Sequence, residues 1–174
     1  MHQPIQKIDA ILEPYLESIG SDIGYVNHTK RMFLYAMELQ DLDETQQEIF
    51  AIALAFHDLG IWTEKSFDYL DPSVALATKY LHTNKNTAYQ NDIIEMISLH
   101  HKITPIKNNT LAELFRKVDM IDVYWGLISF GIAKNRLQEI KKAYPNNNFH
   151  LTLMKWFMKR LFSQPWSPLP MLKW

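Results

Sequence analysis

The chain contains no cysteine and only five glycines among its 174 residues. Without cysteine, a disulfide framework, a thiolate metal site and a cysteine nucleophile are all excluded. Glycine is scarce and no long stretch alternates between apolar and polar residues, so the sequence does not predict a β-rich fold. The missing cysteine also fits a reducing compartment, and we expect a cytoplasmic protein.

A basic block and a long apolar run are absent as well. The 18 lysines and arginines nearly balance the 19 aspartates and glutamates, so a dedicated nucleic-acid surface is not expected. The apolar runs are far shorter than the ~20 residues of a membrane-spanning helix. Residues 1–20 also lack the basic segment and apolar core of a signal peptide. The expected partner is a small molecule rather than a nucleic acid or a membrane, and a homo-oligomer is left open.

Apolar residues instead recur at helical spacing along most of the chain. The length suggests one domain, residues 1–174, that is long enough to bury its own core. Helices are expected over about 5–19, 24–40, 44–58, 71–81, 87–101, 110–121, 129–143 and 149–163. Asp71 before Pro72, and Thr110 before Glu113, are read as the starts of two of these helices. The predicted class is all-α, a single-domain bundle of about seven to nine helices.

The C-terminal part of the chain, residues 145–174, is expected to pack on this domain. Its last segment, "QPWSPLPMLKW", contains three prolines and cannot be helical throughout. Two tryptophans, Trp166 and Trp174, lie in it. Because exposing both indoles is unfavourable, the tail is expected to lie extended against the helices.

A histidine and an aspartate follow directly on the most apolar segment of the chain. Residues 49–56, "IFAIALAF", contain no polar residue, and their three alanines favour a central, fully enclosed helix over a strand. Gly60 stands where a C-cap glycine would. Asp58 would then face the negative end of the helix dipole, which costs up to ~1 kcal/mol. The pair is either a polar helix end that reaches solvent or part of a site where a bound cation supplies the missing positive charge.

Three further polar residues occupy positions that helical spacing turns inward. His28 shares a face with Met32 and Tyr35, His100 continues an apolar face of its helix, and Asp119 follows Val118. A single histidine on an apolar face is usually a satisfied core residue. Several histidines and two carboxylates on separate helices favour a metal site, because buried charges are generally paired or bound to metal.

The order of these residues resembles the H…HD…D signature of the HD-domain superfamily of metal-dependent phosphohydrolases. The matching strings are "NHTKR" around His28, "AFHDLG" around His57 and Asp58, and "RKVDMID" around Asp119, within about residues 23–125. The resemblance implies an HD-domain-like fold and these four residues as ligands of one divalent metal ion. A mixed imidazole and carboxylate set suits Mn, Fe, Co, Ni, Zn or Mg and does not distinguish among them.

The resemblance also suggests roles for neighbouring residues. Arg31, one turn after His28, matches an arginine of the family and is predicted to bind a substrate phosphate or carboxylate; an ordinary surface arginine is the alternative. His100 and His101 are predicted as catalytic residues, either for proton transfer or for contact with a phosphate, with satisfied core histidines as the alternative. Asp122 could replace Asp119 as the ligand, although the family string favours Asp119.

Two residues that could extend the site are less well placed. His82 lies near the wrong end of its helix to hold the second metal ion of some HD proteins. Glu64 is either a general base or a solvated loop residue, and the second reading is favoured. Tyr69 and Trp62 could form the rim of a pocket.

The predicted activity is hydrolysis of a phosphomonoester or phosphodiester on a small phosphorylated metabolite or nucleotide. One departure is that "GIW" follows the His-Asp pair where some subfamilies have glutamate or lysine, so no particular nucleotidase is indicated. Two alternatives remain: a metal-binding module without turnover, and a dinuclear HD enzyme of the oxygenase or hydratase type acting on a non-phosphate molecule.

Overall fold

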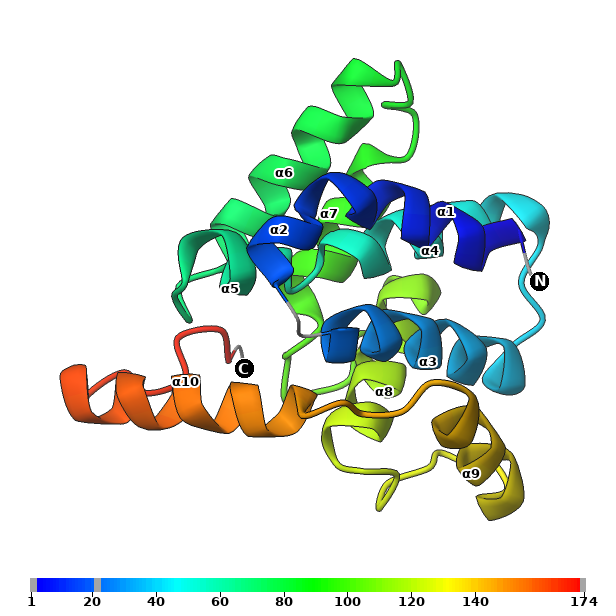
Figure 1. The fold of residues 1–174 in the computed structure, drawn as a ribbon. Helices are drawn as coiled ribbons and strands as arrows, with labels where there is room; N and C mark the ends of the chain where they lie inside the picture. The colour runs from blue at the N-terminus through cyan, green and yellow to red at the C-terminus, as the bar shows by residue number, and fades with distance from the viewer. Residues whose placement is uncertain (1–2, 21–22, 173–174) are drawn as a thin grey trace.

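The computed structural model describes residues 3–20 and 23–172, and in these ranges every regular element is a helix (Figure 1). The described part of the chain contains eight helices of ten residues or more: α1 (Gln3–Leu12), α3 (Ile23–Leu39), α4 (Glu44–Phe56), α6 (Leu70–Thr83), α7 (Gln90–Leu99), α8 (Thr110–Val123), α9 (Lys134–Ala143) and α10 (Phe149–Ser163). Three short elements join them: η1 (Glu13–Tyr15), α2 (Leu16–Ile19) and α5 (Leu59–Glu64). The predicted all-α class is confirmed. No helix in the described ranges is both long and apolar enough to cross a membrane.

Helix α4 is the centre of the molecule. It packs against α1, α3, α5, α6, α7 and α8, and all eight residues from Ile49 to Phe56 are buried. Asp43 and Gln46 form a capping box at its start. The fully enclosed helix expected from the apolar run is confirmed, and it ends one residue before His57.

Two helix starts differ from the expected ones. Helix α8 is capped by Asn109, whose side chain accepts a hydrogen bond from the Ala112 amide, and Thr110 is the first residue inside the helix. Helix α6 begins at Leu70, one residue before Asp71, without a side-chain cap. In both cases the chain enters the helix slightly earlier than the capping residue read from the sequence, a shift that leaves the buried face unchanged.

Gly60 is not the C-cap of α4, as the sequence suggested, but a buried residue inside α5. The reason for glycine is close packing, because a Cβ atom at this position would lie 2.4 Å from the carbonyl oxygen of Tyr69. The Gly60 amide also donates to the Ser73 hydroxyl. This contact fixes the start of α6, and with it Tyr69, beside the His57–Asp58 junction.

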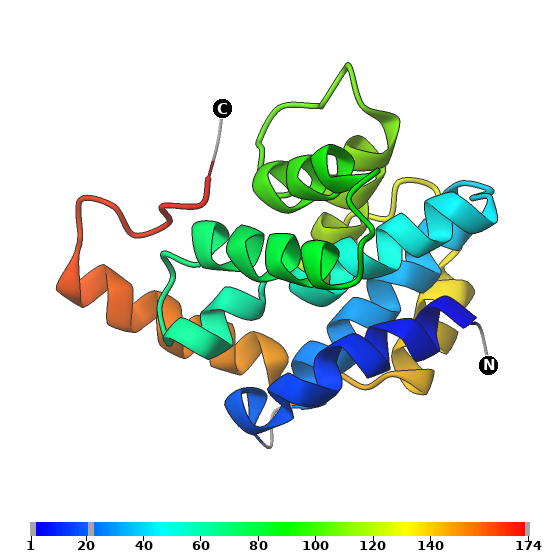
Figure 2. The ribbon, with the colours of Figure 1, turned by 90° about the horizontal axis from the view of Figure 1, so that it is seen from above.

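Helix α10 and the tail stand apart from the compact bundle. Figures 1 and 2 show α10 running outward from the other helices and the tail turning back beside it. Phe149, the first residue of α10, is buried, whereas several large apolar side chains further along the helix are exposed. Over the described part of the tail, residues 164–172, the chain forms turns and no helix, which agrees with the expectation that the tail is not helical throughout.

The expectation that the tail covers its tryptophans is wrong for Trp166, which is 92% exposed. The Ser167 amide donates to the Gln164 carbonyl, so Pro165 and Trp166 occupy the middle of a tight turn that directs the indole outward. The tail instead buries Met171. Trp174 lies outside the described residues.

Candidate metal centre

Six histidine and aspartate side chains from different helices converge beside the C-terminal end of α4. His28 lies in α3, His57 directly follows α4, Asp58 precedes α5, and Asp119 lies in α8. His100 and His101 follow α7. All are buried except His101, which is partly exposed. His28, His100 and Asp119 are therefore buried, as their helical spacing predicted.

The six side chains form two adjoining groups, in each of which the candidate ligand atoms lie within 4.8 Å of one another: His28, His57 and Asp119, and Asp58, His100 and His101. In the first, His28 Nε2 is 3.1 Å from His57 Nε2 and 3.7 Å from Asp119 Oδ1. Asp58 belongs to the second but lies at the boundary, since its Oδ2 is 3.5 Å from His57 Nε2. Three of the four predicted ligands thus share one group and the fourth adjoins it.

Each of three histidines is held by its Nδ1 atom, which leaves Nε2 directed into the cluster. His57 Nδ1 lies 2.8 Å from the Leu54 carbonyl oxygen and His100 Nδ1 2.7 Å from that of Ile97. His28 Nδ1 is 2.7 Å from Asp122 Oδ2. Carbonyls and carboxylates only accept hydrogen bonds, so Nδ1 donates in all three rings, and each ring presents an Nε2 lone pair whenever it is neutral. Metal-binding histidines have this same outer support.

The atoms inside the cluster lack partners that a cation would supply. Burial lowers the pKa of His57 to about 3, so its ring is neutral near pH 7. In the neutral tautomers the Nε2 lone pairs of His28 and His57 face each other. Asp119 Oδ1 is buried without a hydrogen bond, and so is Asp58 Oδ1, which lies 3.3 Å from His100 Nε2. Converging lone pairs and unsatisfied carboxylate oxygens fit a divalent metal ion, which would neutralise them together.

The two carboxylates respond differently to this environment. Burial raises the pKa of Asp119 to about 6, an effect that His100 and His28 only partly offset. Burial also acts to raise the pKa of Asp58, but His57 and His100 outweigh it and hold that pKa well below its usual range. Asp58 in turn keeps the pKa of His100 above its ordinary value despite the burial of that ring. The histidines of the cluster therefore stabilise the charged form of Asp58 more than that of Asp119.

Asp122 is not a candidate ligand, because it lies behind His28 and its oxygens are occupied. Arg31 donates from Nε to Asp122 Oδ1 at 2.7 Å and from Nη2 to Oδ2 at 2.6 Å. Burial acts to raise the pKa of Asp122, but these bonds and the His28 contact hold it well below its usual range. Asp122 orients His28, in the way that outer carboxylates orient metal-binding imidazoles.

Arg31 is placed differently from its predicted role in substrate binding. The side chain is 2% exposed, and besides its two bonds to Asp122 it donates to the carbonyl oxygens of Tyr144 and Pro145. It does not line the cavity that opens beside the cluster. The carboxylate and the loop before α10 occupy its guanidinium group, which is therefore bound within the protein and not directed into the cavity.

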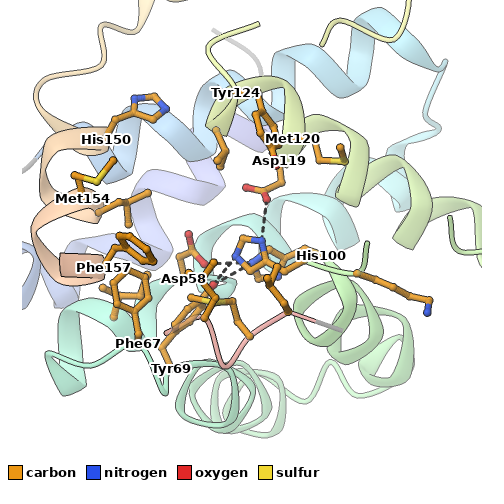
Figure 3. Close-up of a pocket in the computed structure, with 18 of the residues that line it drawn as sticks. Asp58, Phe67, Tyr69, His100, Asp119, Met120, Tyr124, His150, Met154 and Phe157 are labelled. Atoms are coloured by element: carbon orange, nitrogen blue, oxygen red, sulfur yellow. Dashed lines mark hydrogen bonds and ion pairs between the residues drawn. The ribbon is translucent and has the colours of Figure 1, made fainter. Parts of the chain in front are cut away.

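A cavity of about 420 Å³ adjoins the cluster. Figure 3 shows Asp58, Asp119 and His100 on its polar side, with Phe67, Met154 and Phe157 nearby. His101 also lines it, and His101 Nε2 lies 2.7 Å from the Tyr69 hydroxyl. The predicted catalytic histidines therefore lie at the cavity wall, as does Tyr69.

Other residues considered from the sequence lie away from the cavity. His82 and Glu64 are exposed, and Trp62 is buried in the core. Sequence reasoning missed Lys102, the α10 residues and the end of the tail as parts of the cavity wall. The helical spacing of Leu153 and Phe157 marks a common face, but nothing in the sequence says what that face covers.

Comparisons of the chain with family models, curated proteins and solved structures found no match.

Proposed function

We propose that the protein is a metal-dependent hydrolase that cleaves a phosphate ester of a small molecule. The observation that carries the proposal is the pair of buried imidazoles, each fixed through Nδ1, whose Nε2 atoms converge at 3.1 Å beside a buried carboxylate oxygen without a hydrogen bond. His28, His57 and Asp119 would hold one divalent ion, with Asp58 adjoining them. The resemblance to the H…HD…D signature supports the same ligand set.

When bound, the ion would polarise a phosphoryl oxygen and lower the pKa of a nearby water molecule. The protein's own contribution is orientation and proton transfer. Asp122 and Arg31 fix His28. His100 and His101 line the cavity within reach of Asp58 and Asp119 and would move a proton between water and the leaving group.

The proposal is tested by turnover of p-nitrophenyl phosphate and its diester with added Mn²⁺ or Co²⁺. We expect metal-dependent turnover that His57→Ala removes. Tyr89→Ala is a matched control, because this exposed aromatic residue lies outside both groups. Metal binding without turnover of any phosphate ester in a broad panel would instead identify a binding module.

A second candidate is a dinuclear enzyme, including one that acts on a non-phosphate molecule. The specific observation in its favour is the group of Asp58, His100 and His101, whose ligand atoms also lie within 4.8 Å of one another. Metal analysis separates the two: one ion per chain supports the mononuclear site. Two ions, one of which is lost in His100→Ala, would favour the dinuclear enzyme.

A further inference from the structure

The lining of the cavity beside the cluster is mostly apolar. Its polar end comprises Asp58, Asp119, His100, His101 and Tyr69, which contact one another. Lys102, Tyr124, Trp125 and His150 also bring polar groups to the lining. Leu153 and Phe157 lie one turn apart on α10 and form part of another wall, which Met171 from the tail extends. Aliphatic, aromatic and methionine side chains therefore make up most of the lining of this partly open space.

The described lining of the cavity has few of the polar side chains that recognise a nucleotide or a sugar; beyond the polar end, Tyr124 and Trp125 carry such groups. Among the described residues that line it, none is serine, threonine, asparagine, glutamine or arginine, and Lys102 is the only lysine. His150 also lines it, but both of its ring nitrogens are occupied, by Asn146 and by the Asp122 carbonyl. Sugar hydroxyls and base edges buried here would lose their hydrogen bonds to water without replacement, which is costly.

The charges of the lining residues also argue against a nucleotide with several phosphates. Asp58 and Asp119 bring negative charge to the polar end, and a divalent ion would offset it there. A polyphosphate would need several further cations, and the lining provides little beyond Lys102. A ligand with one small polar group at the cluster is compatible with this distribution of charge.

We propose that the cavity takes a small molecule with an apolar alkyl or aryl body, whose single polar reacting group reaches the Asp58–Asp119 end. A volume of about 420 Å³ lies near the lower end of the range for small-molecule pockets, roughly 300–1,000 Å³. Met120, Met154 and Met171 give the wall side chains that adapt to different shapes. This inference rests on the proposed function only for the identity of the reacting group.

The experiment measures calorimetric binding of two ligand series to the Mn²⁺-loaded and the metal-free protein. The first series is n-alkyl phosphonates from methyl to hexyl, which mimic a phosphate ester but cannot be hydrolysed; the second is the matching n-alkanols. In both series each added methylene should tighten binding by up to about fourfold, the factor that corresponds to ~0.8 kcal/mol per buried CH₂. Adenosine monophosphate should compete poorly with hexyl phosphonate.

Two matched variants locate the alkyl chain. Met154 lines the cavity, whereas Met158, one turn further along α10, does not, and both are partly exposed, so neither change should affect folding. Met154→Gln should weaken hexyl phosphonate by about fivefold or more, because it places an amide against the chain. The same variant should leave methyl phosphonate unchanged, and Met158→Gln should leave both ligands unchanged.

The proposal is overturned if affinity does not rise with chain length, if neither series binds, if adenosine monophosphate competes equally, or if the two variants have equal effects. The proposed hydrolase activity fails in a different way. In that case chain length and Met154→Gln would still matter, but Mn²⁺ would not strengthen phosphonate binding over alkanol binding and phosphate esters would not be turned over.

Discussion

Asp119 and Asp122 lie one turn apart on α8 and are equally buried, at 2% exposure. They differ in whether their carboxylate oxygens have hydrogen-bond partners. Arg31 and His28 satisfy both oxygens of Asp122. Asp119 has a buried oxygen without a hydrogen bond and a pKa that burial raises to about 6. The protein thus neutralises Asp122 with its own side chains, whereas an oxygen of Asp119 remains available to the proposed metal ion.

The largest effect is expected for metal binding in Asp119→Asn. Outer partners of metal ligands typically contribute 10–100-fold to metal affinity, so loss of a direct ligand should exceed ~100-fold and reduce turnover to background. Metal content after dialysis, measured by mass spectrometry, checks this result. Asp122→Asn is the matched control and should retain metal with a smaller loss. Equal metal content in Asp119→Asn and the wild type would remove Asp119 from the ligand set.

The second effect is on stability, for which substitution of Asp122 is expected to matter more than substitution of Asp119. Asp122→Ala leaves the Arg31 guanidinium buried without a counter-charge, and breaking such a pair costs about 3–5 kcal/mol of unfolding free energy. Urea unfolding with a chelator present measures this cost without the metal contribution. Under the same conditions Asp119→Asn should be no less stable than the wild type.

A double variant distinguishes the ion pair from general damage to the core. Arg31→Leu combined with Asp122→Leu removes both charges and should regain part of the stability that Asp122→Ala loses. If Asp122→Ala costs less than ~1 kcal/mol, the typical value for an exposed pair, the outer carboxylate does not have the structural role assigned to it. Arg31→Ala should likewise lower stability more than activity per folded molecule, the reverse of the role predicted from the sequence.

The third effect is that of removing the metal. An ion that binds only the folded state contributes roughly 2.7 kcal/mol at a hundredfold excess over its dissociation constant. In a protein of this size that corresponds to a fall in melting temperature of about 5–10 °C on chelation. The helical circular dichroism at room temperature should remain, because the core around α4 does not depend on the cluster. Complete unfolding on chelation would show that the ion is required for the fold.

Sequence patterns predicted most of the buried histidines and aspartates, but not the difference between Asp119 and Asp122. Helical spacing placed His28, His100 and Asp119 on inward faces, and the apolar run placed His57 and Asp58 at the end of the central helix. Spacing cannot distinguish Asp119 from Asp122, because residues three apart share a helix face. The difference between them depends on Arg31.

The position of Arg31 depends in turn on distant parts of the chain. Its guanidinium group is held by carbonyls of Tyr144 and Pro145, more than one hundred residues away in the sequence, so local pattern could not predict its direction.

Local pattern could not predict the cavity wall either. Leu153 and Phe157 reveal an apolar face, but only tertiary packing shows that this face adjoins the cluster.

The last expected effect is on the pH dependence of stability, and it tests the contrast between the two aspartates directly. Burial raises the pKa of Asp119 in the folded, metal-free protein to about 6, above its unfolded value of ~3.9. The folded state therefore binds this proton more tightly, and the stabilising contribution is complete below the unfolded pKa and disappears as the pH rises through about 6. Asp119→Asn resembles the protonated form at every pH. In chelator, the variant should therefore exceed the wild type in unfolding free energy at pH 7.5, and the two should converge only as the pH falls to the unfolded pKa of ~3.9. Asp122 has a lowered folded pKa, so its contribution has the opposite sign: it is present above the unfolded value and lost as the pH falls below it. A constant difference between the wild type and Asp119→Asn across this range would mean that Asp119 is already satisfied without a metal ion.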